Sequence, residues 1–169
     1  LCSVLGMVMM ASARDLVSIF VALELLSIPA YMLAAWRKRD TKGNEAGVKY
    51  YVLGVFASAV LLYGMSFLYG TTGTTKLTEI GAVLAADDLV ALQVVAIAFV
   101  IAGLAFKVSA VPFHTWAPDT YQGAPTPVTA FLSVASKAAG FVALMSLLFL
   151  AFPTATGVYE PLLWVLAAL

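Results

Sequence analysis

Long apolar runs, each interrupted by at most an isolated charge, constrain this chain more than any other feature. Residues 16–36 contain Glu24 as their only charged side chain, and residues 126–151 contain only Lys137. A helix needs about 20 predominantly apolar residues to cross a bilayer, so each run is long enough to do so. The chain is 63% hydrophobic and 11% charged, whereas soluble domains are about 25% charged. The sequence therefore predicts an integral membrane protein.

The apolar runs predict complete membrane crossings at about 16–36, 47–69, 89–121 and 126–151, with partial ones at 1–12 and 161–169. Period-two alternation with regularly spaced turns is absent from the sequence, which disfavours a transmembrane β-barrel. We therefore expect an all-α polytopic transmembrane helix bundle that forms one membrane domain over residues 1–169. Because both ends are apolar, we expect the sequence to be an internal piece of a longer protein.

The polar segments between the runs predict helix ends and orientation. Residues 37–43 (RKRDTKG) are the most basic segment, so the positive-inside rule places this turn in the cytoplasm, with Asn44 as the N-cap of the next helix. The loop 70–88 is acidic, and residues 77–86 within it are expected to form a short surface helix. Aromatic side chains at the expected span ends fit a headgroup belt: Trp36, Tyr69, Trp116 and Tyr121.

The run at residues 89–118 is too long for one simple helix. At 1.5 Å per residue it would extend about 45 Å, against a hydrocarbon core of about 30 Å. Pro112 removes a helical hydrogen bond and clashes with the preceding turn, so we expect the span 89–121 to be discontinuous near Pro112. Broken helices of this kind mark ion and substrate sites in transporters. A simple proline kink is the alternative.

Three ionisable residues, Glu24, Lys107 and Lys137, lie near the middle of their spans. A charge at the bilayer centre costs roughly 2.5–3.5 kcal/mol on insertion scales, so each is expected to face the bundle interior, paired or hydrated, with a shifted pKa. One interpretation is a path for protons. The alternatives are a static Glu24–Lys107 ion pair and a Lys137 that donates to backbone carbonyls without titrating.

Lys49 and His114 are weaker candidates. Lys49 lies near the start of its span, where snorkelling to the membrane surface explains it. The unperturbed pKa of histidine, near 6.5, suits proton relay, but a lone His114 also fits a hydrogen-bonded packing role. Cys2 is the single cysteine, and the sequence contains no metal-ligand motif, phosphate-binding loop or nucleophile elbow. Nine basic and nine acidic residues cancel, so no net charge attracts nucleic acid.

Two long motifs carry a family resemblance. The segments FKVSAVPFHTWAPDTYQGAPTPVTAFLSVASKAAG (106–140) and EAGVKYYVLGVFASAVLLYG (45–64) resemble the antiporter-like membrane subunits of NADH:quinone oxidoreductase, respiratory complex I, and subunit N above all. The resemblance implies a subunit of an enzyme that moves protons across a membrane, coupled to electron transfer from NADH to quinone. It places the chain at about transmembrane helices 4 to 9 of that family, with the second half-channel beyond Leu169.

The resemblance also implies residue roles. Glu24 matches the key glutamate of the family, Lys107 the lysine of the discontinuous helix, and Lys137 the lysine that leads to the second half-channel. Lys49 and His114 also fall on family positions, so the implied proton path contains Glu24, Lys49, Lys107, His114 and Lys137.

The resemblance implies no cofactor and no metal in this chain, whereas NAD, FMN, iron–sulfur clusters and quinone belong to the whole complex. The implied partners are other membrane subunits and the lipid bilayer, in a bacterial inner (plasma) membrane, with no nucleic acid. Two alternatives stay open, namely a subunit of a multisubunit cation/proton antiporter and a static structural scaffold.

Overall fold

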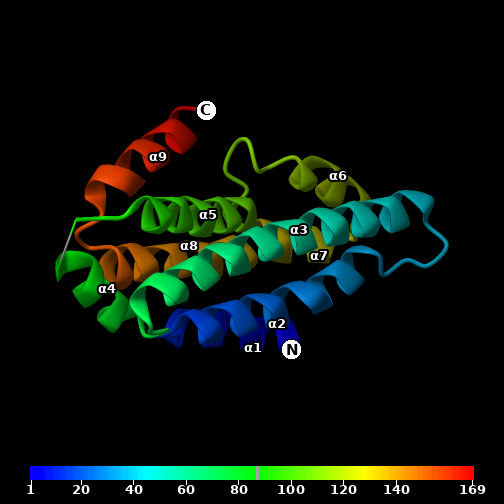
Figure 1. Cartoon of the computed structure of the whole chain (residues 1–169). Coiled ribbons are helices and arrows are strands. Elements are labelled where there is room, and N and C mark those ends of the chain that lie inside the picture. Colours follow the sequence, from blue (N-terminus) through cyan, green and yellow to red (C-terminus); the bar gives the residue numbers. More distant parts are fainter. Residues whose placement is uncertain (87) are drawn as a thin grey trace.

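The chain folds into helices that pack side by side (Figure 1). This computed structural model describes residues 1–86 and 88–169, and residue 87 of the predicted loop 70–88 lies outside the described residues. The helices in chain order are α1 (Cys2–Ser12), α2 (Leu16–Ala34), α3 (Thr41–Thr72), α4 (Leu77–Ala86), α5 (Ala91–Val108), α6 (Trp116–Gly123), α7 (Thr126–Ser133), α8 (Ala135–Ser146), the π-helical turn η1 (Leu147–Ala151) and α9 (Thr156–Ala168).

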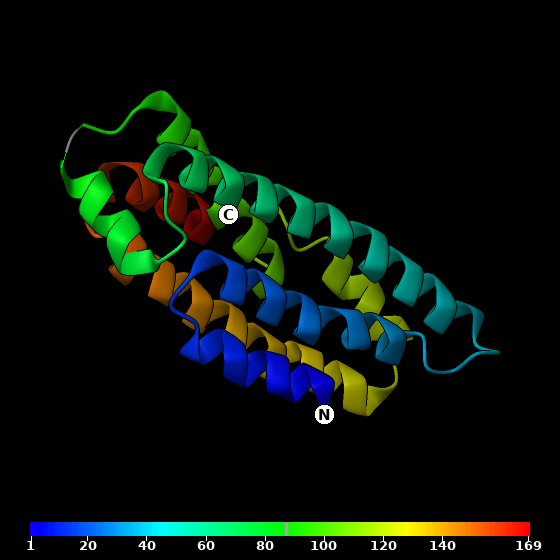
Figure 2. The same ribbon diagram turned by 60° about the horizontal axis from the view of Figure 1, so that its bottom comes forward.

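In the described part of the chain, four helical segments are long and apolar enough to cross a membrane. They are α2, α3, α5 and the stretch Thr126–Ala151, which contains α7, α8 and η1. Successive segments run in opposite directions, so the turn after α2, together with α6 and α7, lies at one end of the bundle and α4 at the other (Figure 1). The turned view shows α1 beside both α2 and α8 (Figure 2). The predicted fold class, an all-α polytopic membrane bundle, is confirmed.

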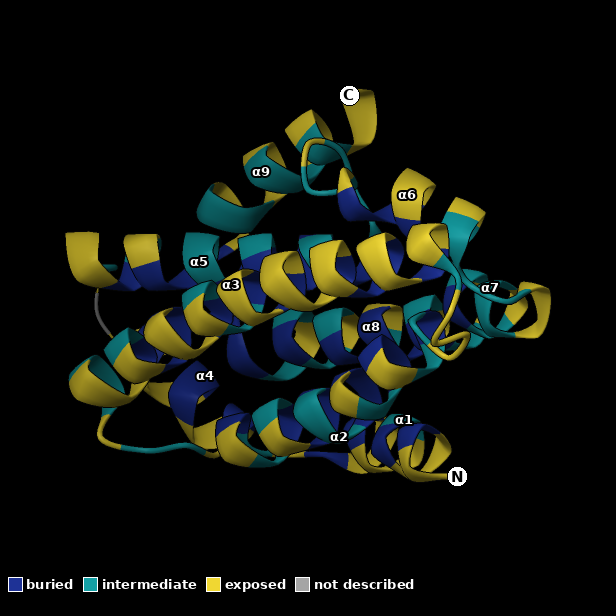
Figure 3. Ribbon diagram, turned by 90° about the vertical axis from the view of Figure 1, so that its right-hand side faces the viewer, coloured by how far each residue is buried: buried dark blue, intermediate teal, exposed yellow. Residues whose placement is uncertain are grey.

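The outward face of α3 is apolar. Val52, Phe56 and Tyr63 are exposed on it, and Figure 3 shows this side of the helix largely uncovered. A continuous exposed apolar face is unfavourable in water and suits contact with lipid or with another membrane subunit. The chain is therefore an integral, multi-pass membrane protein.

The connections around α3 and α4 differ in part from expectation. The predicted short helix at 77–86 is confirmed as α4, although its apolar side is buried against the bundle. Asn44, expected as an N-cap, lies inside α3, so that prediction is wrong. Asp40 caps the helix instead and accepts the Lys42 backbone N–H at 3.1 Å. Asp is as good an N-cap as Asn, and the polar first turn extends the helix beyond its apolar segment.

The predicted interruption of the third span is confirmed. α5 ends at Val108 and α6 begins at Trp116, with Pro112 between them. Ser109 closes α5 in the left-handed region at φ 59°, a conformation that usually calls for glycine. The helix therefore ends before Pro112 is reached. A further irregularity that was not predicted lies in the fourth span, where Val134, at φ −116° and ψ −70°, separates α7 from α8.

Gly103 allows close contact between α5 and α3, and its replacement by alanine tests that contact. A Cβ at Gly103 would lie 2.6 Å from the Leu61 Cβ, which is fixed to the backbone and cannot rotate away. We expect Gly103→Ala to destabilise the protein by about 1–3 kcal/mol, measured as a lower thermal unfolding temperature in detergent. In Gly70→Ala the added methyl group meets nothing within 4 Å, so this control should match or exceed the wild type. Equal unfolding temperatures for the two variants would contradict the packing argument.

Candidate functional site

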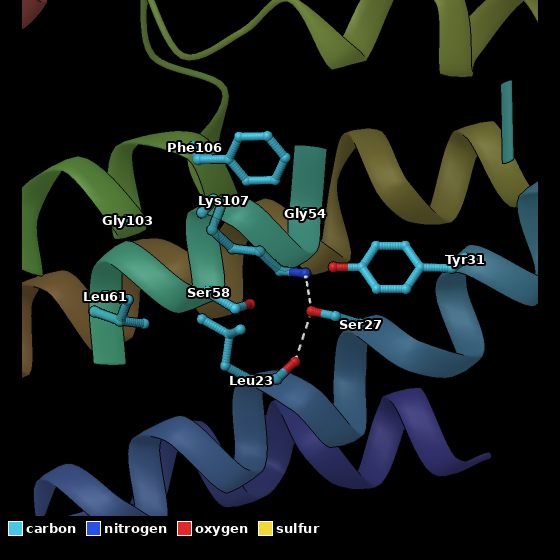
Figure 4. Close-up of a pocket in the computed structure, with 10 residues that line it drawn as sticks. Leu23, Ser27, Tyr31, Gly54, Ser58, Leu61, Gly103, Phe106 and Lys107 are labelled. Carbon is cyan, nitrogen blue, oxygen red and sulfur yellow. Dashed lines mark hydrogen bonds between the residues drawn. The ribbon is translucent and has the colours of Figure 1, made fainter. Parts of the chain in front are cut away.

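The Lys107 amine lies at the centre of a polar chain between apolar helices. The residue sits in the last turn of α5 and is 4% exposed. Its Nζ donates a hydrogen bond to Ser27 Oγ on α2 at 2.8 Å, and Ser27 Oγ donates to the Leu23 carbonyl at 2.6 Å (Figure 4). The hydroxyl of Tyr31 points toward the same amine (Figure 4). The amine therefore has hydroxyl groups as its neighbours, within a largely apolar bundle.

A small cavity surrounds this amine between α2, α3 and α5. The space open to the centre of a water molecule is about 10 Å³, close to the minimum that one water requires. Gly54 of α3 makes room for Tyr31, because a Cβ there would lie 2.7 Å from the tyrosine Cζ. The lining residues are Leu23, Ser27, Tyr31, Gly54, Ala57, Ser58, Leu61, Gly103, Phe106 and Lys107.

Glu24 is half-buried on α2, and its carboxylate is not fully satisfied. Its Oε1 atom is buried and has no hydrogen-bond partner among the described residues. The ion pairs within 4.0 Å in the described chain involve Lys49 and Lys76, so Glu24 and Lys107 form no direct ion pair in this structure. Glu24 lies one turn before Ser27 on α2, and Ser27 bonds to Lys107, so the carboxylate and the amine occupy the same region of the bundle.

Lys137 approaches the same region from α8. It is half-buried, and its Nζ lies 5.5 Å from the centre of the Tyr121 ring, within the range of a cation–π interaction. Gly140 lies one turn further along α8 and packs on Lys107, since a Cβ there would lie 3.1 Å from the Lys107 Cγ. Residues three apart share a helix face, so Lys137 lies within one turn of the point where α8 contacts Lys107.

Lys49 and His114 do not line the Lys107 cavity. Lys49 is exposed and pairs with Glu45 and with Asp119 of α6, both at 2.7 Å, so it ties α3 to α6 at the end of the bundle. His114 is half-buried in the segment between α5 and α6. Its Nδ1 atom is buried without a hydrogen-bond partner in the described residues, and such an atom is ordinarily satisfied by water.

An aromatic cluster that the sequence reasoning missed holds the interrupted helix in place. We define it as Tyr31, Tyr50, Phe106, Trp116 and Tyr121. The Trp116 ring stacks on Tyr50 at 4.5 Å and 14°, and Tyr31 meets Tyr50 edge-on at 4.6 Å. Trp116 Nε1 also donates a hydrogen bond to the Phe106 carbonyl at 3.0 Å. The indole N–H thus provides a partner for a backbone carbonyl near the end of α5, where the helix is interrupted and carbonyls need partners from outside the helix.

The headgroup-belt interpretation of Trp116 is therefore wrong. The residue is 1% exposed, because α6 packs against α3, which covers the tryptophan ring. Helical spacing was the signal that could have identified Ser27 and Tyr31, since positions three and seven after Glu24 lie on nearly the same face of α2.

The site offers an acid, amines and hydroxyl groups. Among the described residues, no three His, Cys, Asp or Glu side chains gather closely enough to hold a metal ion. Groups of this kind within hydrogen-bond reach can accept and donate protons, and a buried amine beside an acid is a typical site of perturbed proton affinity.

Comparisons with known proteins agree on one membrane protein family. The model of the NADH:quinone oxidoreductase/Mrp antiporter transmembrane family matches residues 13–169. NADH-quinone oxidoreductase subunit N of Trichlorobacter lovleyi is 46% identical, covering 97% of this chain and 34% of the relative. NAD(P)H-quinone oxidoreductase subunit 2 of Thermosynechococcus vestitus is 52% identical, covering 100% of this chain and 33% of the relative. The chain thus spans about a third of the length of these relatives.

Solved structures share the fold. A chain of respiratory complex I from Thermus thermophilus, determined with bound aureothin, superposes with a TM-score of 0.76 at 43% identity, over 86% of this chain and 32% of that one. A chain of the Mrp complex from Dietzia sp. DQ12-45-1b superposes with a TM-score of 0.80 at 27% identity, over 90% of this chain and 28% of that one. The architecture is common to both complexes, whereas the sequence is closer to complex I.

Removal of the Trp116 ring tests the aromatic cluster. Trp116→Ala deletes a fully buried aromatic side chain, which typically costs about 3–5 kcal/mol, whereas Trp116→Phe keeps a ring and loses mainly the hydrogen bond to Phe106, worth about 1 kcal/mol. Thermal unfolding of the purified protein in detergent should rank wild type above Trp116→Phe, and Trp116→Phe above Trp116→Ala. Trp36→Ala is the control, because Trp36 is 69% exposed. A loss as large in Trp36→Ala as in Trp116→Ala would refute the anchoring role.

Proposed function

The chain belongs to the NADH:quinone oxidoreductase/Mrp antiporter membrane family, and on this premise we propose that it forms part of the proton-translocating subunit N of an NADH:quinone oxidoreductase. In this proposal the subunit moves protons across the membrane, driven by electron transfer from NADH to quinone elsewhere in the complex. The family match extends over most of the chain, while the chain covers about a third of each relative.

One observation carries the proposal, which is the Lys107 amine buried between apolar helices and bonded to a neutral hydroxyl. A lysine held in this way costs free energy that packing alone does not require. Lysine also exchanges its proton when burial and nearby charges change, unlike arginine. The interrupted end of α5, one residue after Lys107, adds irregular backbone at membrane depth, which is tolerated inside protein or beside water.

The proposed path runs from the end that holds the basic turn 37–43 toward the centre of the membrane. The positive-inside rule supports a cytoplasmic position for this end. Lys49 and His114 belong to its approach, and Lys107 receives the proton near the Glu24 carboxylate. Lys137 then accepts the proton and passes it laterally along the membrane midplane. The contact of α8 with Lys107 at Gly140 supports this last step.

The remaining parts of the proposal concern the whole complex. We place the subunit in a bacterial inner membrane beside other membrane subunits of the oxidoreductase. NAD, FMN, iron–sulfur clusters and quinone would act in the complex but outside this chain. The name of the Thermosynechococcus relative gives its donor as NAD(P)H, and we propose NADH because the Trichlorobacter relative is named for it.

A cation/proton antiporter subunit is the second candidate, favoured by the superposition on the Mrp complex. The identity to that chain is 27%, against 43% for the complex I chain, and therefore favours the oxidoreductase. Sodium-driven proton exchange by the isolated assembly, without peripheral redox subunits, would support the antiporter instead.

Substitution of Lys107 tests the proposed proton path. In the full-length subunit assembled into its complex, Lys107→Ala should lower NADH-driven proton translocation and coupled quinone reduction by about 100-fold or more, the range for loss of a group that transfers a proton. Lys107→Arg should restore only part of the rate, because arginine stays protonated. Both rates are measured in inverted membrane vesicles after the assembled complex has been quantified.

The matched control for Lys107 is Lys76→Ala, which removes a lysine whose side chain is 68% exposed and which lies outside the predicted spans. It should pump at the wild-type rate. Normal pumping by an assembled Lys107→Ala complex would rule out the path through this residue.

Substitution of Glu24 separates a pump from a static scaffold. Glu24→Asp keeps the charge and should retain much of the pumping rate, whereas Glu24→Gln removes the charge that acts on Lys107 and should change the pH dependence of pumping. The measurement is the pH profile of proton translocation in assembled wild-type, Glu24→Asp and Glu24→Gln complexes, with Glu79→Gln on α4 as the control. An unchanged rate and pH profile in Glu24→Gln would favour the scaffold.

A further inference from the structure

Ser27 is the only residue whose side chain forms a hydrogen bond with the Lys107 amine in the described chain. It is 1% exposed and lies on α2, one turn after Glu24. Its Oγ accepts from Lys107 Nζ at 2.8 Å and at the same time donates to the Leu23 carbonyl at 2.6 Å. The hydroxyl is therefore held between a fixed carbonyl and the amine that carries the proposed function.

A hydroxyl differs from a carboxylate in a way that matters for a lysine that exchanges its proton. The ammonium form of lysine offers three donors and no acceptor, whereas the neutral amine has a lone pair that can accept. A serine hydroxyl can donate and accept, while the ionised Glu24 carboxylate can only accept. Ser27 can thus serve the amine in both protonation states, which the acid cannot.

The local backbone allows the change of partner. In the observed arrangement, Ser27 accepts from Lys107 and gives its own hydrogen to Leu23. When Lys107 is neutral, rotation about the Ser27 Cβ–Oγ bond turns this hydrogen toward the amine lone pair. The Leu23 carbonyl stays paired, because it also accepts the backbone N–H four residues later within α2.

We propose that Ser27 is a positioning residue that holds the Lys107 amine in both of its protonation states and keeps it out of a direct ion pair with Glu24. This inference rests on the proposed function, in which Lys107 exchanges a proton. The buried Glu24 Oε1 without a hydrogen-bond partner in the described residues is the counterpart of this arrangement, since the Lys107 amine is bonded to Ser27 instead.

Few other titratable groups face the amine. From α2, Tyr31 lines the cavity and Glu24 lies one turn before Ser27, while α3 contributes the Ser58 hydroxyl but no charged side chain to the cavity lining. From α8 the contact is made by Gly140, with Lys137 one turn away and held over the Tyr121 ring. A change in the pH dependence of pumping after substitution of Ser27 therefore reports on Lys107 together with Glu24.

The experiment compares Ser27→Ala, Ser27→Thr and the control Ser66→Ala in the full-length subunit within the assembled complex. Ser66 lies exposed on α3 and outside the cavity lining, so its substitution removes a hydroxyl of a membrane helix without touching the site. Ser27→Ala should lower proton translocation by about ten-fold, the scale of one hydrogen bond to a charged group, and should change its pH profile. Ser27→Thr keeps the hydroxyl and should restore both rate and profile, and Ser66→Ala should resemble wild type.

A rate and pH profile in Ser27→Ala that match Ser66→Ala would overturn the inference, as would failure of Ser27→Thr to restore them in an assembled complex. If Ser27→Ala does not assemble, Ser27→Cys keeps the side-chain size with a much weaker hydrogen-bonding group, and a wild-type profile there would also overturn it. Lys107→Ala in the same series separates the two ideas. Its normal pumping would reject the proposed function, whereas a loss in Lys107→Ala with normal Ser27→Ala would reject the role of Ser27 alone.

Discussion

The hydrogen bond between Lys107 Nζ and Ser27 Oγ satisfies the most demanding constraint on this bundle, which is to keep an amine among apolar helices. Water is scarce at membrane depth, so protein groups must satisfy the amine. The helices meet this demand by packing tightly, with Gly54 and Gly103 allowing α2, α3 and α5 to approach one another around the cavity. The space that remains is about that of one water molecule, so the position of the amine is set by side chains.

The aromatic cluster fixes the interrupted helix in a similar way, through packed side chains. Trp116 stacks on Tyr50 and donates to the Phe106 carbonyl, which fixes α6 on α3 and satisfies backbone beside Lys107. Tyr31 belongs both to the cluster and to the cavity lining, and Tyr121 contacts Lys137. The cluster therefore joins the surroundings of the two lysines through packed rings. A shift of α6 would therefore displace side chains around both Lys107 and Lys137, because close-packed interiors transmit strain.

The sequence was sufficient for the features that depend on composition and on single strong signals. Apolar length predicted the membrane helices, Pro112 and excess length predicted the interruption, and mid-span position singled out Lys107. The features it did not reveal depend on tertiary contacts. In the sequence Ser27 is an ordinary helical serine, because only the packed fold brings Lys107 of α5 to it. Trp116 was assigned to the membrane surface because its stacking on Tyr50 of α3 leaves no local signal. The left-handed cap at Ser109 could not be predicted either, because the position lacks the glycine that usually indicates such a cap.

The arrangement of Glu24 and Lys107 argues against a purely static role for the pair. A scaffold gains most when acid and amine are in direct contact and all hydrogen bonds are made, because a buried charge without its partner is costly. Here the amine is bonded to a neutral hydroxyl, and one carboxylate oxygen is buried without a partner in the described residues. Groups kept in such a state are typical of sites where charge or protons must move, because a fully satisfied pair would hold its proton too firmly to exchange it.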